Sequence, residues 1–277
     1  MANLRVEVGQ AELERVRRIP TENLTAYDYV LRGREAFLRA FLDTTQKEAN
    51  AQARQLFERA IALDPAYAEA YAWLGHTYLL EWMQQWNLDP QTLERAGELA
   101  QRAIALDDSL PRSHQILSQV YRWKKQHEQA IAEAERTITL DPNSDIAYMY
   151  LGEVLVMAGR PEETIGLVEK AMRLNPRYPV YYLQELGTAY SMTGRYEEAI
   201  APLKRVATFN PNFVFAHLVL ASCYAELGRE EEARAAAAEV LRINPNFSLE
   251  VWRQMIPFKD PAELERYLAG LRKAGLK

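Results

Sequence analysis

Residues 186–211 read LGTAYSMTGRYEEAIAPLKRVATFNP, and the order of residue types in this stretch decides the fold. A leucine is followed directly by Gly187 and, three residues after the glycine, by Tyr190. Gly194 then interrupts the chain, and a second segment, EEAIAPLKRVATF, continues to Pro211. Proline cannot continue a hydrogen-bonded helix and disfavours a helical conformation in the residue before it. The stretch therefore predicts two short helices joined by a tight turn.

The same order recurs along the chain. The second helix of each unit ends at one of six stops: Pro65, Asp108, Pro142, Pro176, Pro211 and Pro245. The last four stops are 34, 35 and 34 residues apart. Self-similarity at such a period is typical of stacked helical repeats, in which each unit buries its apolar face against its neighbours. We therefore expect an all-α protein.

Four glycines occupy the same place in their units: Gly33, Gly75, Gly152 and Gly187. A glycine inside a helix costs about 1 kcal/mol relative to alanine. Its repetition at one position indicates that the two helices of each unit pack closely there.

The Leu, Gly, Tyr, Ala and Pro pattern at a 34-residue period resembles the tetratricopeptide repeat and covers residues 26–245. The resemblance implies a right-handed α-solenoid of about six hairpins. Their expected bounds are 26–65, 68–108, 111–142, 145–176, 180–211 and 214–245. Residues 1–25 are expected to form an N-terminal linker or helix. Residues 246–277 are expected to form two helices, broken at Pro257, that cap the last hairpin.

A second resemblance concerns the flanks, PTENLTAYDYVLRGRE at 20–35 and FSLEVWRQMIPFKDPAELERYLAGLRKAGL at 247–276. They are similar to the flanks of the repeat region that follows the catalytic domain in certain bacterial class III adenylate/guanylate cyclases. Similar regions also follow some bacterial winged-helix regulators. The resemblance implies a regulatory context, with residues 1–20 as the tail of a linker. None of the catalytic residues of a cyclase can be mapped onto this chain.

Charge and cysteine content exclude several classes. The net charge of −5 argues against a sequence-independent nucleic-acid binder, which carries a basic surplus. Cys223 is the only cysteine, which excludes an internal disulfide and a cysteine-based zinc site. No uncharged apolar run approaches the roughly 20 residues that span a bilayer, and the first 18 residues contain charges throughout. We therefore expect a cytoplasmic protein that binds neither membranes nor nucleic acid.

No pattern in the sequence predicts catalysis. The tandem acids Glu162–Glu163, Glu197–Glu198 and Glu231–Glu232 fall in first turns of helices, where the helix dipole favours acids. The four histidines are His76, His114, His127 and His217, and no two have the spacing of a helical metal motif. Phosphate-binding loops and nucleophile motifs are also missing. We expect no enzymatic activity, no metal and no cofactor.

In tetratricopeptide arrays the first helices line a concave face, and the fifth and ninth residues of each unit point into it. Carried over with the bordering positions, this predicts a groove formed by Arg34, His76, Arg112, Gln115, Gln119, Arg122, Trp123, Met149, Glu153, Met157, Tyr181, Gln184 and Phe215. The Lys and Asn residues with which chaperone-binding members clamp a carboxylate are missing at these positions. Gln amides suit a peptide backbone, Arg suits acids, and the aromatics suit apolar side chains. Trp123, Tyr181 and Phe215 could equally pack between units.

The second unit carries about nine extra residues around EWMQQWNLDPQ. Trp82 and Trp86 are four residues apart, which places them on one face of a helix. They either cap the longer turn of their own hairpin or form an aromatic patch that contacts a partner or a second copy.

The leading hypothesis is a protein-interaction scaffold that binds a peptide or helical segment in its groove. The alternative is a regulatory or dimerisation module of a bacterial signalling protein. Expected partners are thus a protein or peptide, an attached signalling domain, or a second copy of the chain.

Overall fold

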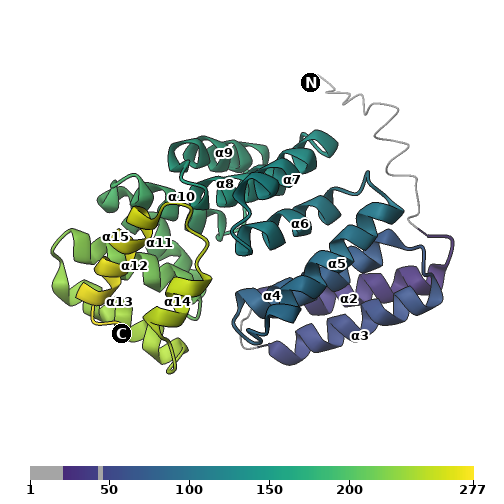
Figure 1. Ribbon diagram of the computed structural model, residues 1–277, viewed down its shortest axis with the longest axis horizontal. Coiled ribbons are helices and arrows are strands. Elements are labelled where there is room, and N and C mark those ends of the chain that lie inside the picture. Colours follow the sequence, from purple (N-terminus) through teal and green to yellow (C-terminus); the bar gives the residue numbers. More distant parts are fainter. Residues whose placement is uncertain (1–20, 43–45) are drawn as a thin grey trace, which may run out of the picture.

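The computed structural model describes residues 21–42 and 46–277, which contain fourteen α-helices and no β-strand. They pair into six successive hairpins, followed by two further helices (Figure 1). The bounds are α2 Leu24–Leu42, α3 Lys47–Leu63, α4 Ala68–Met83, α5 Pro90–Leu106, α6 Pro111–Trp123, α7 His127–Leu140, α8 Asp145–Met157, α9 Pro161–Leu174, α10 Tyr182–Met192, α11 Tyr196–Phe209, α12 Val214–Glu226, α13 Glu230–Ile243, α14 Leu249–Met255 and α15 Pro261–Lys273. The predicted right-handed α-solenoid is confirmed. The proposed linker at residues 1–20 lies outside the described residues.

The hairpin of α10 and α11 shows how the sequence forms one unit. Gly194 has a positive φ of 75°, a left-handed conformation that glycine adopts without steric cost. The amide of Arg195 then donates to the carbonyl oxygen of Tyr190 at 2.8 Å, which closes the end of α10. In the first turn of α11, Glu198 pairs with Arg195 at 2.5 Å. Gly159 and Gly228 have the same left-handed conformation in the next hairpins on either side.

The close approach predicted at the repeated glycines is confirmed at Gly187. A Cβ atom on this residue would lie 2.5 Å from Cγ of Leu203, which is fully buried on α11. Because Gly187 has no side chain, α10 and α11 can approach each other closely at this point.

The C-terminal helices pack differently from a seventh hairpin. Helix α15 lies against α12 and α13, where Leu268 and Leu271 are fully buried. Helix α14 lies toward the first helices of earlier units, and its Met255 joins the apolar cluster around Ile116. The last residue, Lys277, accepts a hydrogen bond from the amide of Leu249 at 2.8 Å. The chain end is thereby fixed to the start of α14.

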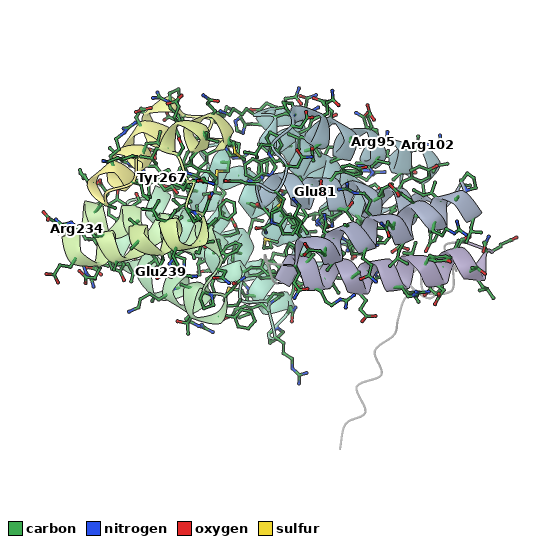
Figure 2. The ribbon with its side chains drawn as sticks, turned by 90° about the horizontal axis from the view of Figure 1, so that it is seen from below. Glu81, Arg95, Arg102, Arg234, Glu239 and Tyr267 are labelled. Carbon is green, nitrogen blue, oxygen red and sulfur yellow. The ribbon has the colours of Figure 1, made fainter. Side chains whose placement is uncertain are left out.

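Charged side chains of the second helices lie on the outer surface. Figure 2 shows Arg95 and Arg102 projecting outward from α5. On α13, Arg234 and Glu239 also point outward, whereas Tyr267 of α15 is half-buried. None of the helices in the described ranges is long and apolar enough to cross a membrane.

Candidate functional site

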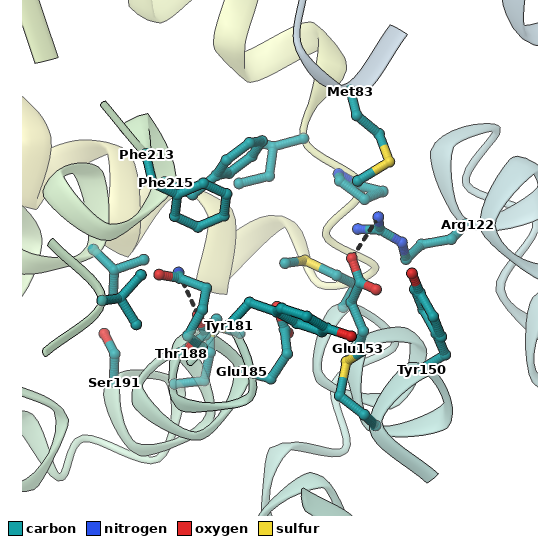
Figure 3. Close-up of a pocket in the computed structure, with 18 of the residues that line it drawn as sticks. Met83, Arg122, Tyr150, Glu153, Tyr181, Glu185, Thr188, Ser191, Phe213 and Phe215 are labelled. Carbon is teal, nitrogen blue, oxygen red and sulfur yellow. Dashed lines mark hydrogen bonds and ion pairs between the residues drawn. The ribbon is translucent and has the colours of Figure 1, made fainter. Parts of the chain in front are cut away.

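A cavity of about 220 Å³ lies between the first helices of the later units and the C-terminal segment. We call it the inner cavity. Helices α6, α8, α10 and α12 supply 13 of its 28 lining residues, and Trp252 with residues 256–258 closes it from the C-terminal side. Figure 3 shows Phe213 and Phe215 on one side and Tyr150, Glu153 and Tyr181 on the other. Aromatic and methionine side chains predominate, with a few polar groups among them.

Eight of the thirteen groove residues named from the sequence line this cavity: Arg122, Trp123, Met149, Glu153, Met157, Tyr181, Gln184 and Phe215. The structure thus brings together some of the candidates of the third unit and all those of the fourth to sixth units. Trp123 is only 5% exposed and belongs to the cluster of Ile116 and Leu117, so it packs between units while also lining the cavity.

Arg34, His76 and Arg112, which come from the first three units, lie elsewhere, around Trp73. The Arg112 guanidinium lies 3.8 Å from the centroid of the Trp73 ring, and that of Arg34 lies 5.3 Å from it. The ring of His76 is 4.4 Å from that of Phe37. Burial, and secondarily the charge of Arg112, lowers the pKa of His76 to about 3, so this imidazole is neutral at physiological pH. Gln115 and Gln119 are buried and do not line the cavity.

An ion pair lies at the cavity wall. Nη2 of Arg122 is 2.7 Å from Oε1 of Glu153, and the two side chains are 4% and 12% exposed. Nε of Arg122 also donates to Oε1 of Gln119 at 2.9 Å. Burial raises the pKa of Glu153, while the charge of Arg122 opposes that rise. Each charge of this buried ion pair therefore offsets the cost of removing the other from water.

Sequence reasoning missed Glu185, which follows Gln184 on α10 and lines the cavity. Burial, followed by the neighbouring charge of Glu153, raises the pKa of Glu185 to about 8, and Arg122 lowers it in part. Within the described ranges, no hydrogen bond or ion pair joins this carboxyl to another group. The sequence could have indicated it, because Glu185 follows the predicted groove residue Tyr181 by four residues and so lies on the same side of the helix.

The C-terminal part of the wall was also missed. Trp252, Ile256 and Phe258 line the cavity, and the Trp252 ring lies 5.5 Å from that of Phe215. Because residues 246–277 fall outside the 34-residue pattern, periodicity could not place them on the inner side.

Trp82 and Trp86 do not share a helical face, so that expectation was wrong. Helix α4 ends at Met83, and the chain turns at Gln85, whose φ is 55°. Trp82 packs against the cluster containing Leu79, whereas Trp86 packs against a different cluster containing Leu80. Both rings are half-buried.

The loop after α4 instead approaches the far end of the array. Nδ2 of Asn244, which follows α13, lies 3.4 Å from Oε1 of Gln85. Around this contact, Trp86 and Phe247 line a second cavity. The extra residues of the second unit therefore bring two distant parts of the chain together.

Among the residues that the structure describes, no three His, Cys, Asp or Glu side chains are grouped so that they could hold a metal ion. Cys223 is buried, and burial raises the pKa of its thiol to about 11. This thiol is therefore protonated at physiological pH and is a poor nucleophile.

Three sequence profiles described as tetratricopeptide or TPR repeats match residues 44–80, 124–179 and 190–255. Together they cover more than half of the chain. A protein of Rhizobium meliloti (strain 1021) named "Putative adenylate cyclase 3" is 36% identical over 128 residues. The match covers 46% of this chain and 21% of that protein, so the matched segment spans about a fifth of the length of the relative.

Solved structures with the same fold include a chain of the APC/C hetero-tetramer Cut9-Hcn1, with a TM-score of 0.63 and 17% identity over 88% of this chain and 46% of that one. PilF of Pseudomonas aeruginosa has a TM-score of 0.54 and 20% identity, covering 83% of this chain and 96% of that one. The type IV pilus biogenesis factor PilW has a TM-score of 0.54 and 18% identity, with coverages of 73% and 88%. At these identities the likeness concerns the fold alone.

Proposed function

This chain belongs to the tetratricopeptide-repeat family, and on that premise we propose that it holds a peptide or helical segment of another protein in the inner cavity. The repeat array is a protein-interaction scaffold, and the proposal concerns where it binds and what. The observation that carries it is the cavity itself, whose apolar wall includes a few convergent polar groups, as is usual for binding sites.

The rim of the cavity offers an aromatic contact. Phe209, the last residue of α11, lines the cavity and is nevertheless 68% exposed. Most large aromatic side chains of this protein are buried or half-buried. Exposed aromatics beside a cavity are typical of binding surfaces, where such residues often supply a large share of the affinity.

Phage display with the full chain as bait tests the proposal. We expect enrichment of peptides with apolar side chains, and we expect Phe209→Ala to weaken their binding about tenfold or more. Leu241→Ala is the matched control, because Leu241 is 42% exposed on α13 and lies outside the cavity. If no peptide is enriched, or if both variants bind the enriched peptides like the parent chain, binding in the cavity is refuted.

The second candidate function is a regulatory module of a larger signalling protein. It is favoured by one observation, the match to part of a relative named as an adenylate cyclase. The direct test is isothermal titration of this chain with the remaining part of that relative. Saturable binding supports the regulatory function, and the absence of heat in that titration contradicts it.

A further inference from the structure

One carboxyl group at the inner cavity has no counter-charge of its own. The guanidinium of Arg122 is already neutralised by Glu153 at 2.7 Å. Glu185 lies near both charges, but no ion pair connects it to another described residue. When Glu185 is ionised, the cavity wall therefore carries an excess negative charge. An acidic ligand would be repelled there, whereas a cation would supply the missing partner.

The surroundings of Glu185 suit the aliphatic stem of a basic side chain as well as its charged end. Figure 3 shows Tyr150, Glu153, Tyr181 and Glu185 on the same side of the cavity. Both tyrosine rings are half-buried and face the cavity. Aromatic rings attract cations through their π faces, and they also pack against the methylene groups of Lys and Arg.

A second group at the wall needs a partner from outside. Gln184 is 5% exposed and lines the cavity. Its Nε2 donates to Oγ1 of Thr188 at 3.2 Å, but its Oε1 is buried with no hydrogen-bond donor in the described part of the chain. A buried acceptor without a donor is unfavourable. The amide N–H of a bound peptide backbone would satisfy it.

These observations lead to one ligand class. We propose that the segment held in the inner cavity carries a lysine or arginine side chain that enters beside Glu185, while a backbone amide of the segment donates to Gln184. The inference rests on the proposed function and adds the chemistry that the partner must have. It does not extend to the Trp73 cluster, whose Arg34 and Arg112 lie outside the cavity.

Three pools of seven-residue peptides test it, with acetylated and amidated ends and random apolar or small residues at six positions. The central residue is lysine, the uncharged norleucine, or glutamate. Binding to the full chain is followed by fluorescence anisotropy. We expect the lysine pool to bind about tenfold or more tightly than the norleucine pool, and the glutamate pool to bind most weakly.

The matched variants are Glu185→Gln and Glu231→Gln. Glu231 is exposed on α13, outside the cavity, so Glu231→Gln should keep the preference for lysine. Glu185→Gln should remove that preference while its circular dichroism spectrum stays helical. If the parent chain binds the lysine and norleucine pools equally, the inference is overturned and peptide binding still stands. If no pool binds and phage display enriches nothing, the proposed function itself fails.

A pH series distinguishes cation binding from a merely structural role of Glu185, because a structural role would not make the affinity for the lysine pool depend on pH. Among the described residues, the charged groups that act on Glu185 are Glu153 and Arg122, and the titratable Tyr150 and Tyr181 lie on the same side of the cavity (Figure 3). Because a cation binds the ionised carboxyl, the affinity for the lysine pool should increase from pH 6.5 to pH 9, whereas in Glu185→Gln it should stay flat. An equal increase in both proteins would contradict the assignment of the cation to Glu185.

Discussion

The backbone amide of Lys259 donates a hydrogen bond to the carbonyl oxygen of Met157, with 2.9 Å between nitrogen and oxygen. Met157 ends α8 in the fourth unit, whereas Lys259 lies in the turn between the last two helices. The ammonium group of Lys259 also reaches Glu128 on α7 at 2.6 Å. The C-terminal segment is thus joined to the middle of the array as well as to its last hairpin. It covers an end of the solenoid and completes the wall of the inner cavity.

Deleting residues 246–277 should therefore cause aggregation or fraying of the last units. The deletion uncovers the apolar face of α12 and α13 and removes Trp252 and Phe258 from the cavity wall. Size-exclusion chromatography and thermal denaturation measure the effect. Leu268→Ala is a milder test, because the residue is fully buried, and should cost about 2–5 kcal/mol of the free energy of unfolding. A monomeric truncated chain with unchanged melting would show that the segment stabilises nothing.

Removing one partner of the Arg122–Glu153 pair should lower the free energy of unfolding more than removing both partners. Arg122→Met leaves a buried carboxylate without its counter-charge and should cost about 3–5 kcal/mol of the free energy of unfolding. The double variant, Arg122→Met with Glu153→Leu, removes both charges and should recover most of that loss. Urea denaturation of the parent chain, the two single variants and the double variant gives a double-mutant cycle, which measures the coupling energy of the pair. Additive losses would mean that the pair has no coupling.

The sequence predicted the hairpins because their signals are local and repeated, namely a glycine at the turn of each of the last three hairpins and a proline at most stops. It predicted eight of the residues that line the inner cavity, because groove positions carry over by periodicity from unit to unit. Glu185 and Trp252 were missed for different reasons. The environment of Glu185 depends on burial and on the charge of Glu153, which is on another helix. Trp252 reaches the cavity through long-range packing that no short pattern encodes.

Glu185→Gln should stabilise the protein most at alkaline pH. Burial raises the pKa of Glu185 from 4.5 to about 8, so the folded chain holds a proton that the unfolded chain releases between these values. Stability from this group is therefore full below pH 4.5 and is lost as the pH rises toward 8. Glutamine does not titrate, so the advantage of the variant should grow from pH 5 to pH 9.

Urea midpoints of parent and variant at both pH values measure this difference. Glu163→Gln is a control of opposite sign, because its ion pair with Arg160 lowers the pKa of Glu163. That pair is exposed, so its effect should be small. An advantage of Glu185→Gln that is the same at pH 5 and pH 9 would refute the raised pKa.

Gly187→Ala and Gly166→Ala should shift stability in opposite directions, although both replace a glycine inside a helix. Alanine favours the helix by about 1 kcal/mol at either position. At Gly166, on the exposed side of α9, a Cβ atom meets nothing within 4 Å, so the gain should appear in full. At Gly187 the new methyl group would lie 2.5 Å from Cγ of the fully buried Leu203. Moving α10 away from α11 costs about 1–3 kcal/mol, which exceeds the gain. Denaturation midpoints should therefore rise for Gly166→Ala and fall for Gly187→Ala. A rise for Gly187→Ala would show that the repeated glycines do not serve close packing.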